Sequence, residues 1–123
     1  MIGRKIYKER FFFCDFYKFN FSSKKLKAIF STAEPPSAAN PITFVNGTSP
    51  PALLIHGLGD RTVLAKHSKN LAARLEAANV DVTTHYYVDT GHAAVVASIA
   101  EPLRAWSDAY TDTINYLDAL SDR

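Results

Sequence analysis

Two residues of this 123-residue sequence have the types and positions needed for proton transfer. Asp60 follows a short apolar run, residues 52–55, and His92 follows an alternating segment, residues 80–88. A carboxylate that accepts a hydrogen bond from one imidazole nitrogen leaves the other nitrogen as a base. Such a base can deprotonate a serine hydroxyl near pH 7. Spacing alone leaves open a second interpretation, in which Asp60 is a turn residue and His92 an unrelated loop residue.

The elements before these residues predict that they meet. Ala52 to Ile55 lies between two prolines and two glycines, which is typical of a strand buried on both faces. A helix is predicted from about Val63 to Ala78, with Leu64, Leu71, Leu75 and Ala78 on one face. Val80 to Val88 alternates as a half-buried strand does. Strand, helix and strand form a right-handed βαβ unit with parallel strands. Both carboxyl ends then lie at one sheet edge, so an Asp60 oxygen is expected within roughly 2.6 to 3.2 Å of a His92 nitrogen.

The remaining sequence predicts helices that cover the sheet. Ala93 to Ala100 is a short apolar helical stretch that ends before Pro102. Beyond it, apolar residues recur at steps of three and four, which predicts one amphipathic helix starting at Leu103. Trp106 and Tyr110 on this helix are expected in the core. The sequence class is therefore α/β.

Composition limits the class of protein. A chain of this length forms at most one modest domain, and 47% hydrophobic with 21% charged residues indicates a globular one. No run approaches the roughly 18 to 20 apolar residues that span a bilayer. Cys14 is the only cysteine, which excludes an intrachain disulfide and a thiolate-rich metal site. The basic, aromatic start has no small-residue cleavage site and makes a poor signal peptide, so a cytoplasmic location is expected.

Residues 1–25 differ from the rest, which suggests a division into a segment 1–25 and a domain 26–123. Residues 1–27 carry a net charge of +6 and residues 28–123 one of −4. Six of the eight phenylalanines fall within residues 11–21. The segment is interpreted as an unrelated or disordered leader; basic and aromatic residues could instead contact nucleic acid or an anionic membrane. No RNA-binding signature is present, so no specific nucleic-acid partner is predicted.

The sequence PPALLIHGLGDRTV, followed by KNLAARLEAANVDVTTHYYVDTGH, resembles the carboxyl-terminal third of an α/β-hydrolase of the esterase/lipase type. In that family the pattern PPxLLxHGxxDxxV carries the acid of a Ser-Asp-His triad, and a later Gly-His pair carries the base. The resemblance, which extends upstream to about Leu26, implies that Asp60 is the acid and His92 the base. It implies a partial α/β-hydrolase fold, a C-terminal βαβ unit plus final helices, a small-molecule ester as substrate, and no cofactor.

One family feature is missing from the sequence. The family carries its nucleophile in G-x-S-x-G on a strand-to-helix elbow before the acid. No such pattern occurs here, and none of the five serines before Asp60 has flanking glycines between a strand and a helix (Ser22, Ser23, Ser31, Ser37 and Ser49). The chain is therefore expected to be inactive alone and to self-associate through an unpaired edge of the first strand. The alternative is a non-catalytic remnant or binding module, with the basic leader contacting an acidic partner.

The other histidines have alternative interpretations. LLIHGLG also resembles the family's early oxyanion strand, which would place His56 and Gly57 beside the oxyanion hole. The acid-strand interpretation is favoured, because Asp60 has the acid's spacing to Val63, and it gives His56 no catalytic role. A metal site from His85, Asp89 and His92 would need a helical segment, so none is predicted. His67 is expected on the solvated side of the helix.

Overall fold

The computed structural model describes residue 28 and residues 40–122. In chain order the elements are η2 (Pro41–Phe44), β1 (Ala52–Gly57), α2 (Lys66–Ala77), β2 (Val82–Tyr87), α3 (His92–Ala97), η3 (Glu101–Trp106) and α4 (Ala109–Ser121). The expectations for residues 1–25 lie outside the described residues. No helix in the described part of the chain is long and apolar enough to cross a membrane.

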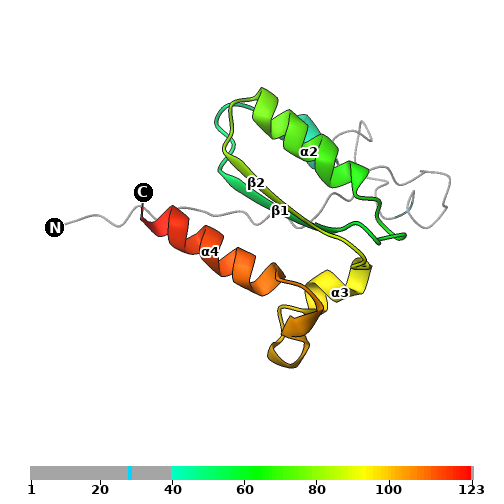
Figure 1. The fold of residues 1–123 in the computed structure, drawn as a ribbon. Helices are drawn as coiled ribbons and strands as arrows, with labels where there is room; N and C mark the ends of the chain where they lie inside the picture. Colours follow the sequence, from blue (N-terminus) through cyan, green and yellow to red (C-terminus); the bar gives the residue numbers. More distant parts are fainter. Residues whose placement is uncertain (1–27, 29–39, 123) are drawn as a thin grey trace.

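The two strands form the centre of the described fold, as Figure 1 shows. They pair in parallel, with Ala52 opposite Val82 and Gly57 opposite Tyr87, which confirms the predicted βαβ unit. Helix α2 lies on one face of the sheet and α4 on the other, while α3 lies beyond the carboxyl ends of the strands (Figure 1). Polar residues that follow the strands are therefore brought to one edge.

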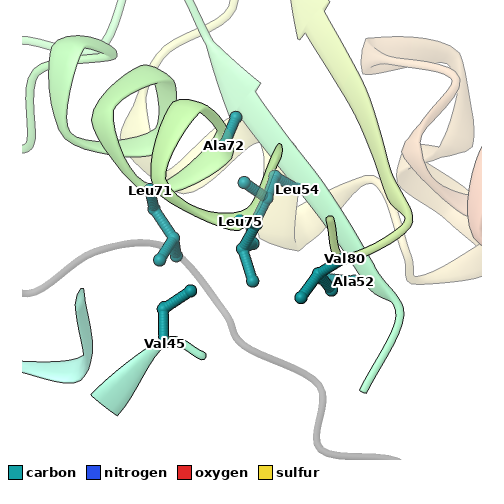
Figure 2. Close-up of a cluster of buried hydrophobic side chains, with 7 residues drawn as sticks. All are labelled: Val45, Ala52, Leu54, Leu71, Ala72, Leu75 and Val80. Carbon is teal, nitrogen blue, oxygen red and sulfur yellow. The ribbon is translucent and has the colours of Figure 1, made fainter. Parts of the chain in front are cut away.

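A small apolar core joins β1 to α2 (Figure 2). Leu54, at the centre of β1, is only 1% exposed, and Leu71 and Leu75 of α2 pack against it. Leu71 and Leu75 are four residues apart and therefore share one face of the helix, as the sequence pattern predicted. Val80 and, from the loop before β1, Val45 complete the cluster.

The boundaries of α2 differ from the prediction at its start. The helix begins at Lys66, because residues 60–63 form a turn held by the Asp60 side chain. Leu64 therefore precedes the helix and is exposed, whereas His67, expected on the solvated side, is buried. The end is as predicted: Asn79 adopts a left-handed φ of 56°, a conformation that asparagine tolerates and that stops a helix.

The prediction of one helix from Leu103 is wrong. Residues 101–106 form the short helix η3, and α4 begins only at Ala109, after extended backbone at Ser107. The Ser107 hydroxyl bonds the Ser98 hydroxyl at 2.6 Å, which holds this break. Trp106 is consequently 56% exposed and lies outside the core, contrary to expectation.

The loops after the two strands touch through their backbones. The Gly59 N–H donates to the Thr90 carbonyl at 3.1 Å, and the Leu58 N–H donates to the Tyr87 carbonyl at 2.8 Å. A Cβ at Gly57 would lie 2.1 Å from the Thr90 oxygen, so only glycine permits this approach. A Cβ at Gly91, in contrast, would meet no atom within 4 Å.

This contrast provides a matched pair of substitutions. We expect Gly57→Ala to lower the free energy of unfolding by at least about 2 kcal/mol, because the new methyl group must push the residue 90 backbone away. Gly91→Ala, which adds the same group in open space, should cost less than about 1 kcal/mol. Urea denaturation followed by circular dichroism measures both. Equal costs would contradict the proposed close approach.

Candidate active site

The structure brings Asp60 and His92 together. The Asp60 Oδ2 atom lies 2.8 Å from the His92 Nδ1 atom, within the predicted range. The two side chains differ in exposure: that of Asp60 is 5% exposed and that of His92 is 55% exposed. The carboxylate is thus enclosed by protein, while the imidazole that it contacts is open on its other side.

The second oxygen of Asp60 is held by its own loop. Oδ1 accepts hydrogen bonds from the Thr62 and Val63 backbone N–H groups, each at 2.8 Å. Aspartate often accepts from amides two and three residues onward, so this contact could have been predicted from the sequence. The two oxygens therefore have separate tasks: one fixes the loop and the other faces His92.

These contacts keep the Asp60 carboxylate ionised. Burial by itself raises the pKa of this carboxyl group, but the bond from the Val63 amide, the bond from His92, the bond from the Thr62 amide and the His92 charge outweigh it. The net result is a pKa below the ordinary value of 3.8. An ionised carboxylate only accepts hydrogen bonds, so the His92 Nδ1 atom must carry the proton. In the neutral ring, Nε2 then has the free lone pair of a base.

The favoured interpretation of the sequence gives His56 no catalytic role, but the structure places this residue beside Asp60. His56 is 3% exposed, and its Nε2 atom lies 3.6 Å from the Asp60 Oδ2 atom. Its ring also contacts the Ser68 hydroxyl and the Val63 carbonyl. The sequence shows only that His56 ends an apolar strand directly before a glycine. Its partners, Val63 and Ser68, lie 7 and 12 residues further along the chain, and sequence spacing does not identify them.

A second acid–histidine contact lies on the other face of the sheet. The Tyr87 hydroxyl donates to the Asp112 Oδ2 atom at 2.5 Å, and the His85 Nδ1 atom lies 3.2 Å from the same oxygen. Burial, the bond to Asp112 and the negative charges of Asp112 and Asp108 raise the pKa of Tyr87 well above its ordinary value. This cluster joins β2 to α4.

His85, Asp89 and His92 do not form a metal-binding cluster. His85 contacts Asp112 on the α4 face, whereas His92 contacts Asp60 beyond the strand ends. Within residues 40–122, no three His, Cys, Asp or Glu side chains gather as they would around a metal ion.

The lowered pKa of Asp60 predicts how stability depends on pH. A carboxyl group whose pKa is lower in the folded chain stabilises the fold above its unfolded pKa, about 3.9, and this contribution disappears as pH falls through the folded pKa. We expect wild-type protein to be more stable than Asp60→Asn at pH 6, with the difference shrinking toward pH 3. Urea midpoints between these pH values measure it, and Asp118→Asn, on the exposed side of α4, controls for the loss of one charge. A difference independent of pH would contradict the prediction.

A family profile and several solved structures match this chain. The sequence profile described as the Prolyl oligopeptidase family matches residues 16–121, a span that begins inside the segment expected to be a separate leader. A search of curated proteins gave no match.

Solved structures with the same fold are larger proteins. A truncated form of a carbohydrate esterase from gut microbiota shares 25% identity over 68% of this chain and 27% of its own, with a TM-score of 0.56. A thermophilic esterase of the Planctomycetes species Thermogutta terrifontis, bound to propionate, shares 18% identity over 82% and 36%, with a TM-score of 0.59. The α/β hydrolase MGS-M1 from a Medee basin deep-sea metagenome shares 18% over 64% and 36%, with a TM-score of 0.52.

The chain thus spans about a quarter to a third of the length of these structures. The parallel strand pair with helices on both faces is part of an α/β-hydrolase fold. Because the family profile covers most of the sequence, the chain belongs to the prolyl oligopeptidase family.

Proposed function

We propose that this chain carries the acid and the base of a Ser-Asp-His triad that hydrolyses carboxylic esters. The observation that supports it best is the 2.8 Å contact between a buried, ionised Asp60 and a half-exposed His92. The esterases among the similar structures support the ester as substrate class.

The proposed chemistry assigns one task to each side chain. A serine hydroxyl gives its proton to the His92 Nε2 atom while the serine oxygen bonds to the ester carbonyl carbon. The imidazolium, stabilised by Asp60, then gives that proton to the departing alcohol oxygen, which leaves an acyl-serine. Water repeats the two proton transfers and releases the acid and the free serine.

The nucleophile is the part that this sequence does not supply. The 123 residues contain no G-x-S-x-G pattern. Two of the described serines form hydrogen bonds away from His92: Ser68 with His56, and Ser98 with Ser107. The proposed reaction therefore requires a serine and oxyanion donors from polypeptide outside these residues.

The acid–base pair is tested by acylation of His92 with diethyl pyrocarbonate. In Asp60→Asn the side-chain amide donates to Nδ1, so the proton moves to Nε2 and the free lone pair is lost. We expect His92 to react at least about tenfold more slowly in this variant, a smaller loss than the roughly 10⁴-fold fall that the same change causes in a complete triad. Peptide mass spectrometry measures the rate, with His85 of the same molecule as the internal reference. Equal rates for His92 in both proteins would refute the pair.

Catalysis by the chain alone gives a separate prediction. We expect it to hydrolyse p-nitrophenyl acetate no faster than free imidazole at the same concentration, because a base without a positioned nucleophile and oxyanion donors contributes little. A serine-directed phosphonate should have no effect. Burst kinetics, lost both in His92→Ala and in one serine variant, would show that a nucleophile is present in this chain.

A further inference from the structure

His56, Ser68 and Asp60 have the residue types of a triad, but their geometry excludes that role. Ser68 is 1% exposed and His56 3%, so a substrate carbonyl has no access to the hydroxyl. The His56 Nε2 atom is also nearer to the Val63 carbonyl, at 2.9 Å, than to the Asp60 Oδ2 atom, at 3.6 Å. These side chains are therefore arranged for a different purpose.

The bonding partners of His56 determine where its protons lie. A carbonyl oxygen only accepts, so Nε2 carries a proton and donates it to Val63. In the neutral ring, Nδ1 then accepts from the Ser68 hydroxyl at 2.7 Å. The imidazole thus bridges the first turn of α2 to the loop after β1, and its Nε2 atom lies 3.6 Å from the Asp60 oxygen that faces His92.

The same loop residue completes the connection. The Val63 carbonyl accepts a hydrogen bond from the His56 ring, and the Val63 N–H donates one to the Asp60 Oδ1 atom. Movement of Val63 away from His56 would therefore release one of the two amides that hold the Asp60 carboxylate. A buried donor or acceptor that loses its partner is unfavourable, so both bonds oppose that movement.

We infer that His56 is a positioning residue for the acid: through Val63 and Ser68 it fixes the loop that aims the Asp60 carboxylate at His92. This inference rests on the proposed role of Asp60 as the orienting acid. His56 itself touches no reacting atom. The neighbouring His67 is also buried, but on α2, and it takes no part in these bonds.

Two substitutions of similar size separate positioning from simple packing. In His56→Gln the side-chain amide can still donate to the Val63 carbonyl, whereas His56→Met fills similar space with no donor. In the Met variant we expect the Thr62 and Val63 amides to exchange with solvent about fivefold faster, with the Leu71 amide of α2 as the internal reference. We also expect the pKa of Asp60 to rise toward its ordinary value. The Gln variant should stay close to wild type in both respects.

The readouts are amide hydrogen exchange and titration of the Asp60 carboxyl carbon by NMR. His67→Met is the matched control, because it makes the same change at a nearby buried position and should leave the pKa of Asp60 unaltered. If His56→Met does not fold, Ser68→Ala serves instead: loss of the hydroxyl frees the ring to reorient, and Asp60 should respond in the same direction.

An Asp60 pKa and a loop exchange rate that are unchanged in both His56→Met and Ser68→Ala would overturn the inference. Equal effects of Met and Gln would also overturn it, since packing alone would then explain them. Failure of the proposed function is distinguishable, because it appears as His92 reactivity that is insensitive to Asp60→Asn while the exchange results stand.

Discussion

The candidate site depends on the parallel pairing of β1 and β2. Pairing in parallel places both carboxyl ends at one edge, and the ladder continues beyond the strands through the Leu58–Tyr87 and Gly59–Thr90 backbone bonds. The approach at Gly57 leaves no room for a side chain. Asp60 and His92 are 32 residues apart, yet each lies within a few residues of this contact. Backbone pairing therefore brings the two residues close together, and the side-chain contacts of Asp60 complete their alignment.

Much of this arrangement could be predicted from the sequence. The apolar run before Gly57, the alternation before Asp89 and the helical repeat between them are local patterns, and local patterns identify a βαβ unit. The rule that polar residues after parallel strands meet at one edge then pairs Asp60 with His92. The start of α2 differs from the prediction because the Asp60 side chain folds residues 60–63 into a separate turn, a contact that the apolar repeat does not report. Trp106 was misplaced because a hydroxyl contact between Ser98 and Ser107 interrupts the apolar repeat.

The contacts of His56 could not be predicted in this way. Its partners are a helix hydroxyl and a loop carbonyl, and the distances to them depend on how α2 packs on β1. That packing depends on the apolar cluster around Leu54, two residues before His56 on the same strand (Figure 2). The core and the site thus share one strand face, with apolar side chains at its start and a hydrogen-bonded imidazole at its end.

The attachment of α4 has a mechanical consequence. A single Asp112 oxygen receives both the Tyr87 hydroxyl and the His85 ring. Tyr87 and His85 stand on the same face of β2, about 6.6 Å apart along the strand. Successive residues of a helix are only about 1.5 Å apart along its axis, so one residue of α4 spans the distance between them only through its side chain. A shift of α4 along the strand would lengthen at least one of these contacts. The shared oxygen therefore fixes the register of α4 against β2, much as a ladder of backbone bonds fixes the register of two strands.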